Sequence, residues 1–193
     1  MTPSLKSLPD MNNQIAVSLR VNPGNTFESF EREPGTTQVL SAFRQVLDGP
    51  RFMLLEYGGV GNGKTHLLHA SALELYQKGL FTRVLVFSEI LSMLRASINN
   101  PERDYDYILN NYCHADRVII DDIGAGGSDS EYGDRILESI VCTRYNRNLL
   151  TLMATNRDIT TLPERVLSRL QDKSTSFLVQ NKGGDYRSRK NNG

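Results

Sequence analysis

Neither sign of charge predominates in this sequence. Its 193 residues include 22 Lys and Arg and 22 Asp and Glu, which gives a formal net charge of +0. A uniformly basic nucleic-acid-binding protein is therefore excluded, because such a protein draws its affinity from an excess of Lys and Arg facing the phosphates. Any contact with DNA must come from a local patch or from several subunits acting together.

Long hydrophobic runs and cysteines are also scarce. No apolar run approaches the ~20 residues that cross a bilayer, and residues 1–14 lack the apolar core of a secretory signal. The two cysteines, Cys113 and Cys142, lie far apart in the sequence and match no metal-binding spacing. The sequence therefore predicts a reduced, cytoplasmic protein without a membrane span.

Short apolar runs alternate with helical patterns over most of the chain. The runs predict strands at residues 52–57, 84–87, 118–120, 149–154 and 176–179. The helical patterns lie at residues 36–47, 64–78, 89–97, 104–112, 131–145 and 163–170. This order predicts an α/β fold with a mostly parallel five-stranded sheet flanked by helices. One domain is expected at residues 26–193, after a flexible, polar tail or linker at residues 1–25.

A glycine-rich stretch between the first predicted strand and the next helix matches the phosphate-binding P-loop pattern in full. It consists of Gly58, Gly59, Val60, Gly61, Asn62, Gly63, Lys64 and Thr65. Glycines let backbone N–H groups turn toward phosphates, and the helix N-terminus adds partial positive charge. We expect Lys64 to reach the β and γ phosphates and the Thr65 hydroxyl to bind Mg²⁺.

Two acids end the third predicted strand. Residues 118–120 are apolar and are followed by Asp121 and Asp122. Ligands of open α/β sheets lie at the carboxyl edge, which is where both carboxylates are expected. Asp121 is the candidate Mg²⁺ ligand, and Asp122 is the candidate base that orients the attacking water.

Two further polar features follow. The fourth strand ends at Asn156, whose amide either holds the attacking water or only shapes a turn. Arg165 and Arg169 are four residues apart and share one face of the last helix. That face either presents a guanidinium to a γ phosphate or is an ordinary solvated surface.

Together these residues resemble the AAA+ ATPases. Within that group they resemble the bacterial replicative helicase loaders of the DnaC and DnaI type and their relatives, the IstB transposition ATPases. The resemblance runs from about Thr26 to Arg189. It rests on residues 26–30, 63–67, 119–124, 144–145, 155–156, 164–170 and 186–189.

The resemblance implies a role for several residues. It places His66 at the exit of the P-loop beside the nucleotide, and Asn156 where the sensor 1 residue lies. Arg169 would be the arginine finger, acting on the nucleotide of a neighbouring subunit, and Arg187 would be sensor 2. The implied fold is a three-layer AAA+ sandwich with little or no C-terminal lid.

The resemblance also implies a function. The chain would be an ATP- and Mg²⁺-dependent ATPase of DNA replication that assembles into a ring or spiral. It would act on single-stranded DNA and load a hexameric replicative helicase of the DnaB type. Asp122 replaces the usual Glu and implies slow hydrolysis. The short sequence after Arg187 favours the loaders over initiators of the DnaA type, which carry a further DNA-binding domain.

Other features leave alternatives open. Loaders usually grip the helicase with an N-terminal domain, so a removed domain, a compact phage- or element-encoded form and a different grip are all compatible with residues 1–25. In the family, an insertion after the second strand lines a single-stranded DNA path. Residues 89–112 occupy that position, with Arg95 and Arg103 as candidate phosphate contacts.

Three other functions share many of these motifs. An IstB-like helper ATPase of a transposase would carry nearly all of them. A P-loop kinase of a small molecule would use Arg169 within its own site but leaves Asn156 and Arg187 unexplained. A nucleotide-dependent scaffold would bind ATP without hydrolysing it, as the short acid Asp122 permits.

Overall fold

The computed structural model describes residues 16–17, 21–98, 100, 104–125 and 130–186, and in them six strands form one sheet in the order β1-β3-β4-β5-β2-β6. All neighbouring strands in this sheet are parallel. The strands are β1 Ala16–Val17, β2 Met53–Gly58, β3 Arg83–Val86, β4 Arg117–Ile123, β5 Leu150–Thr155 and β6 Ser176–Asn181. The expected α/β fold with five long parallel strands is confirmed, and β1 adds a two-residue edge strand.

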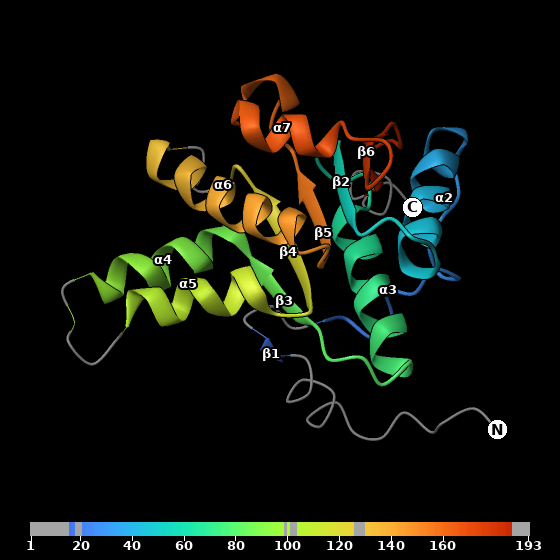
Figure 1. Ribbon diagram of the computed structural model, residues 1–193. Helices are drawn as coiled ribbons and strands as arrows, with labels where there is room; N and C mark the ends of the chain where they lie inside the picture. The colour runs from blue at the N-terminus through green and yellow to red at the C-terminus, as the bar shows by residue number, and fades with distance from the viewer. Residues whose placement is uncertain (1–15, 18–20, 99, 101–103, 126–129, 187–193) are drawn as a thin grey trace.

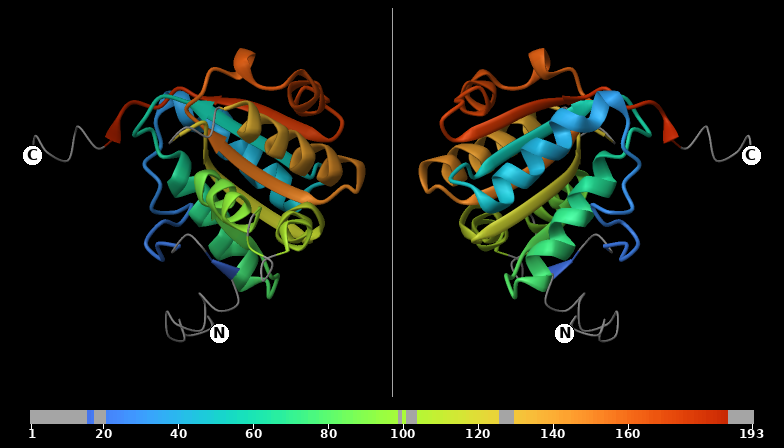
Figure 2. Two further views of the ribbon diagram at one scale, coloured as in Figure 1. Left: turned by 90° about the vertical axis from the view of Figure 1, so that its left-hand side faces the viewer. Right: turned by 90° about the vertical axis from the view of Figure 1, so that its right-hand side faces the viewer.

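Helices cover both faces of the sheet (Figures 1 and 2). They are α2 Thr37–Asp48, α3 Lys64–Gln77, α4 Phe87–Ser97, α5 Tyr105–His114, α6 Glu131–Asn146 and α7 Glu164–Leu170. A short 3-10 helix, η1 Pro34–Thr36, precedes α2, and another, η2 Ile159–Thr161, lies between β5 and α7. This gives three layers, because parallel strands are buried on both faces and need a helical layer on each.

Two apolar cores fill the space between the layers. On one face, α2 and α3 pack through Phe43 and Leu67 against Leu54 of β2. On the other face, α4 to α7 pack against a second set of strand residues that includes Met53 and Leu55. Neighbouring residues of one strand thus enter opposite cores, as the pleat requires. Within the described ranges, no helix is long and apolar enough to cross a bilayer.

Part of the segment expected to be a flexible tail belongs to the fold. Ala16 and Val17 pair with Arg83 and Val84 of β3, and Val21 is buried in the core. The physical reason is that β3 would otherwise leave its backbone groups unpaired at the edge of the sheet. Two residues of backbone pairing need no apolar pattern, so the polar composition did not indicate this strand.

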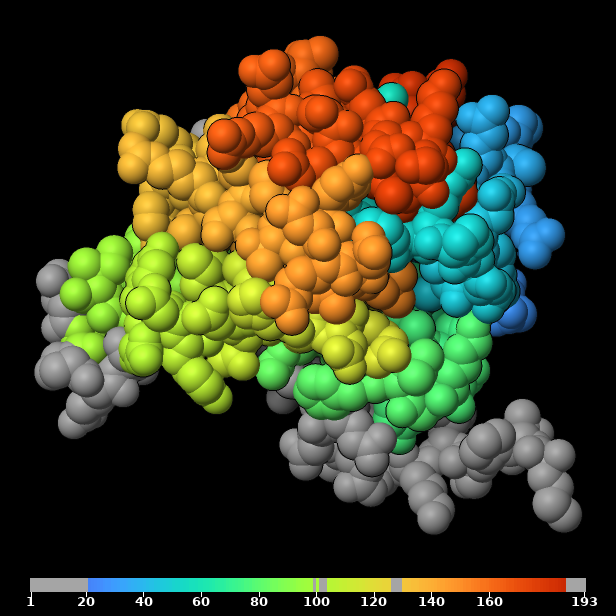
Figure 3. Space-filling view, viewed as in Figure 1, coloured from blue at the N-terminus to red at the C-terminus, as the bar shows by residue number. Residues whose placement is uncertain are grey.

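The sheet brings distant parts of the chain to one edge. β2 ends at the P-loop, β4 carries the two acids near its carboxyl end, and β5 ends just before Asn156. Because all three strands are parallel neighbours, their carboxyl ends meet at the same place. The space-filling view shows the closely packed outer surface of the molecule on the side seen in Figure 1 (Figure 3).

Candidate nucleotide site

A cavity of about 800 Å³ opens at the carboxyl edge of the sheet. Besides the P-loop, it is lined by the ends of β3, β4 and β5, by the N-terminal segment of residues 24–36, and by C-terminal residues between 183 and 186. A volume of this size suits a nucleotide-sized ligand. The lining is rich in backbone N–H groups and polar side chains, which suits an anionic ligand better than an apolar one.

The P-loop has the backbone conformation that its glycines predict. Gly61 and Gly63 have φ of 78° and 92°, in the left-handed region that side chains disfavour. At Gly63 a Cβ would also lie 2.6 Å from Cε2 of the Phe30 ring. The loop leads directly into α3, which begins at Lys64 and directs its free N–H groups into the cavity.

Lys64 is buried under the loop that it follows. Its Nζ donates to the carbonyl of Gly58 at 3.0 Å and to Oδ1 of Asn62 at 2.9 Å, and it also donates to the carbonyl of Gly59. These three acceptors are neutral oxygens, and together they hold the ammonium in one position. A phosphate that entered the cavity would therefore find a pre-positioned cation.

Thr65 and Asp121 meet across the cavity floor, as the sequence predicts for a Mg²⁺ site. The hydroxyl of Thr65 donates to Oδ2 of Asp121 at 2.7 Å. Burial raises the pKa of Asp121, while the hydrogen bond from Thr65 opposes that rise. A hydroxyl and a carboxylate are hard oxygen ligands, so these two residues would hold Mg²⁺, which would offset the negative charge of bound phosphates.

Asp122 and Asn156 lie together at the mouth of the cavity. The amide of Asn156 donates to Oδ1 of Asp122 at 3.3 Å. Both consecutive acids line the cavity because the register of β4 shifts between Ile120 and Ile123, and Asp122 has φ of 58°. In a regular strand, neighbouring side chains would point to opposite faces. The amide and the carboxylate thus form a polar pair suited to holding a water molecule.

Arg165 and Arg169 stand apart from this cavity. Arg169 is absent from the described lining; its Nη1 donates to the carbonyl of Arg165 at 2.8 Å, and its guanidinium lies 5.5 Å from the Tyr145 ring centre. Arg165 forms an ion pair with Glu138 at 3.1 Å. Arg187 lies outside the described residues, so the structure leaves its predicted role untested.

Of the two candidate DNA contacts, Arg95 is described and Arg103 is not. Arg95 is exposed on α4, and its guanidinium lies 5.1 Å from the centre of the Tyr132 ring on α6. A guanidinium that stacks on an aromatic ring keeps its edge donors accessible. The predicted contact with a phosphate stays a prediction.

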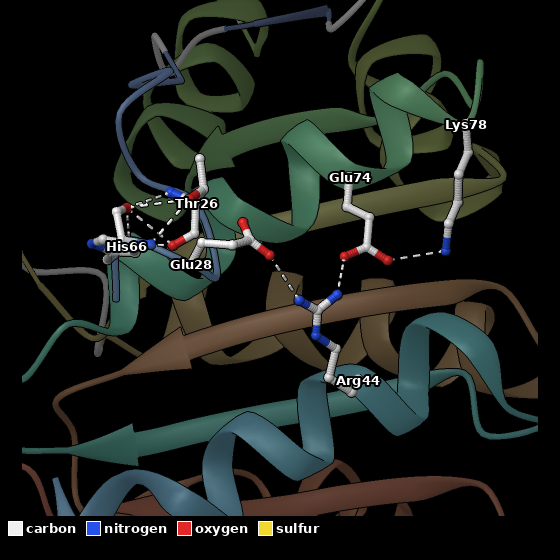
Figure 4. Close-up of polar contacts among 7 residues, drawn as sticks. Thr26, Glu28, Arg44, His66, Glu74 and Lys78 are labelled. Atoms are coloured by element: carbon white, nitrogen blue, oxygen red, sulfur yellow. Dashed lines mark hydrogen bonds and ion pairs between the residues drawn. The ribbon is translucent and has the colours of Figure 1, made fainter. Parts of the chain in front are cut away.

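The N-terminal segment closes one side of the cavity and is held by α2 and α3 (Figure 4). Nε2 of His66 donates to the carbonyl of Thr26 at 2.8 Å, and the His66 ring meets Phe30 edge-on at 5.3 Å. Arg44 of α2 links Glu28 of this segment to Glu74 of α3. His66 lines the cavity as expected, and these contacts fix the wall beside it.

The sequence did not indicate the C-terminal wall of the cavity. The amide of Tyr186 donates to the carbonyl of Gly61 at 2.9 Å, and the amide of Gly184 donates to Glu33 at 3.0 Å. Glu56 and Asn181, which lie directly beneath the P-loop, were also missed. The one available signal was an acid, Glu56, inside an otherwise mostly apolar run.

The geometry defines the class of protein first: a P-loop nucleotide-binding domain with the α/β AAA+ fold. The model of the family described as the bacterial DnaA ATPase domain matches residues 21–175. The chain therefore belongs to the family of bacterial DnaA ATPase domains.

Comparisons with individual proteins agree with this assignment. The chromosomal replication initiator protein DnaA of Aliarcobacter butzleri is 32% identical over 114 residues, which are 58% of this chain and 26% of that protein. The chain thus spans about a quarter of the length of that relative. A structure of the replication initiator DnaA bound to AMPPCP and single-stranded DNA has a TM-score of 0.70 at 22% identity, with 85% of this chain and 51% of that chain covered.

The fold is also shared with helicase loaders. The crystal structure of the DnaC helicase loader has a TM-score of 0.66 at 20% identity and covers 82% of this chain and 97% of that chain. The family match is to the ATPase domain of DnaA-type initiators, so the preference for a loader over an initiator stays a prediction. Both groups share the fold of this chain, so the fold does not separate them.

Proposed function

We propose that this chain binds ATP with Mg²⁺ and hydrolyses it slowly, as an ATPase that assembles during the initiation of DNA replication. The observation that carries the proposal is one cavity that joins Lys64, the Thr65–Asp121 pair and the Asp122–Asn156 pair, while Arg169 stands outside it. Such a site would bind nucleotide within one chain. Its described lining contains no arginine that could contact the γ phosphate.

Each residue of the site has a distinct role in this proposal. Lys64 and the P-loop amides bind the phosphates, and Thr65 and Asp121 hold Mg²⁺. Asp122 accepts a proton from the attacking water, which Asn156 helps to orient. Arg169 of a neighbouring subunit supplies the missing positive charge, and Arg187 is assigned the sensor 2 role. Asp122 is one methylene shorter than Glu and reaches less far toward the water, which favours slow turnover.

The finer part of the proposal concerns the partners. The chain assembles with ATP into a ring or spiral on single-stranded DNA and delivers a hexameric, DnaB-type replicative helicase. Arg95 and Arg103 contact the DNA backbone in this scheme, and binding by one subunit is weak and salt-sensitive because the net charge is +0. The fold shared with DnaC supports the loader function, and the family match supports initiation more broadly.

The test is ATP turnover per subunit, measured against protein concentration with and without single-stranded DNA. We expect turnover per subunit to rise with concentration and to rise further with DNA, because each site needs Arg169 of a neighbour. Lys64→Ala is the control and should abolish nucleotide binding, since it removes the cation beneath the phosphates. Turnover that is flat with concentration and indifferent to DNA would overturn the proposal in favour of a site complete within one chain.

The partner is tested separately by affinity capture with ATP from a mixture of purified proteins. Capture of the ring helicase supports the loader function. Capture of a transposase instead supports an IstB-like helper, and phosphate transfer to a small molecule by the dilute monomer supports a kinase. Binding of ATP without any turnover at high concentration would identify a nucleotide-dependent scaffold.

A further inference from the structure

Three polar side chains are buried directly beneath the P-loop. Glu56 of β2 is 0% exposed, Asn62 of the loop is 5% exposed and Asn181 of β6 is 3% exposed. They come from three separate parts of the chain, and β2 and β6 are parallel neighbours in the sheet. Burying three polar groups is unfavourable unless they are hydrogen-bonded, so their contacts should explain why they are there.

Their contacts form a chain that ends on Lys64. Nδ2 of Asn181 donates to Oε1 of Glu56 at 2.6 Å and to the carbonyl of Asn62 at 2.9 Å. Nδ2 of Asn62 returns a hydrogen bond to the carbonyl of Asn181 at 3.0 Å. Oδ1 of Asn62 then accepts from Nζ of Lys64 at 2.9 Å. The Asn62 side chain thus has one fixed orientation, with its oxygen aimed at the ammonium.

The Glu56 carboxyl is fully buried, away from solvent. Its second oxygen, Oε2, has no partner among the described residues, and burial raises the pKa of Glu56 to about 8. Two charged groups on neighbouring elements influence the ionisation of Glu56. Lys64 on α3 favours the ionised carboxylate, and Asp121 on β4 opposes it. The β6 neighbour is the neutral Asn181, and Ala154 of β5 lies opposite Glu56 in the sheet.

We propose that Glu56, Asn181 and Asn62 form a positioning relay that holds the ammonium of Lys64 in place beneath the phosphate site. The inference rests on the proposed function, because it concerns the affinity of the same site for nucleotide. An ionised carboxylate beneath the loop would repel the phosphates and attract the ammonium away from them. Keeping that carboxyl neutral therefore favours anion binding at neutral pH.

The relay has a consequence that a purely structural network lacks. When the pH rises through about 8, Glu56 ionises and nucleotide affinity should fall. The phosphates themselves complete their ionisation near pH ~6, well below this range, so they do not cause such a fall. A network that only held the loop together would leave the affinity unchanged until the protein began to unfold.

The experiment measures the dissociation constant of ADP with Mg²⁺ by calorimetry between pH 7 and pH 9 on the full chain. We expect the wild-type dissociation constant to rise about fivefold over this range and that of Glu56→Gln to change less than about twofold. Gln has nearly the shape of Glu and keeps an oxygen for Asn181, but it cannot ionise. Ser71→Ala is a matched control, because Ser71 is equally buried on α3 and only donates to the Leu67 carbonyl.

The outcomes separate this inference from the proposed function. Parallel pH profiles for wild type and Glu56→Gln would overturn the relay, and a flat wild-type profile would overturn it even if the variant failed to fold. Thermal unfolding without nucleotide checks the folding of each variant, and Glu56→Leu serves as a second uncharged one. No binding of ADP by the wild type at pH 7 would instead contradict the proposed function.

Discussion

At the scale of single residues, the acid at the cavity mouth has an unusual backbone. Asp122 is at φ of 58°, and its carboxylate accepts from Asn156. Asp and Asn tolerate this left-handed region better than most residues, because their short side chains bond locally. An amide at this position therefore tests the chemistry without straining the chain.

We expect Asp122→Asn to bind ATP normally and to hydrolyse it at least about 100-fold more slowly, because an amide does not accept the proton of the attacking water. The measurements are nucleotide affinity by calorimetry and phosphate release in a single turnover. Asp116→Asn is the matched control, since the Asp116 side chain is 82% exposed and distant from the site in the fold. Equal turnover in wild type and Asp122→Asn would remove Asp122 from catalysis.

A buried histidine makes a second prediction at this scale. Nδ1 of His69 lies 3.3 Å from the amide nitrogen of Asn22 and 3.2 Å from Nδ2 of Asn25, and it accepts hydrogen bonds from both. Burial is the main cause that lowers the pKa of His69 from 6.5 to about 4. Between these values the unfolded chain binds a proton that the folded chain does not, so the free energy of unfolding falls as the pH falls.

We expect this free energy to decrease from pH 6.5 to pH 4 in the wild type relative to His69→Gln, by up to about 3 kcal/mol. Gln keeps an acceptor for Asn22 but does not titrate. Urea unfolding at several pH values measures the difference, and His114→Gln is the control because His114 is exposed. Superimposable curves for wild type and His69→Gln would show that His69 is not kept neutral.

At the scale of elements, one arginine of α6 joins the end of α5 to the start of β5. Arg144 is 0% exposed and donates to the carbonyls of Tyr112, Ala115 and Leu150 at 2.7 to 2.8 Å. Its Nε donates to the Thr151 hydroxyl at 2.8 Å. These acceptors lie at the end of α5 and at the start of β5. One side chain thus provides hydrogen bonds to the backbone carbonyls at the ends of two elements.

We expect Arg144→Met to lower the free energy of unfolding by about 3 to 5 kcal/mol, because it leaves several buried carbonyls unpaired. Chemical denaturation measures this loss, and Arg147→Met is the control, since Arg147 is exposed just after α6. A loss below about 1 kcal/mol would mean that water or a rearrangement satisfies those carbonyls.

At the scale of the whole molecule, the nucleotide cavity and the arginine helix are separate. Arg169 on α7 contacts Arg165 and Tyr145 rather than the cavity of its own chain. Assembly of several chains provides a way to bring this arginine to a γ phosphate. Under the proposed function, the described part of one chain would offer a nucleotide site and, on α7, a separate surface that completes the site of a neighbour.

We expect Arg169→Ala to bind ATP normally and to lose turnover by about 1,000-fold, as for other arginine fingers. Mixing it with Lys64→Ala should restore part of the activity, because one subunit then supplies the arginine and the other the nucleotide. Steady-state ATP turnover of the mixture measures the rescue. Arg165→Ala, on the same helix and paired with Glu138, is the control, and no rescue in the mixture would argue against action between subunits.

Local patterns determined much of this protein before its fold was known. The glycines of the P-loop, the apolar strands and the helical periods depend on neighbours in the sequence, so the five long strands, the six helices and the phosphate site were all predictable. The positions of Lys64, Thr65, Asp121 and Asn156 follow from the rule that parallel strands end at one edge.

Contacts between distant segments were decided by the tertiary structure alone. The pairing of residues 16–17 with β3, the wall formed by residues 183–186 and the relay from Glu56 through Asn181 to Asn62 have no local signature. The sequence places Asp122 at this edge, but the shift in the register of β4 decided that its side chain faces the cavity. These features depend on backbone groups, on partners more than 50 residues away or on an irregularity of a strand. A pattern of neighbouring residues carries no information about any of the three.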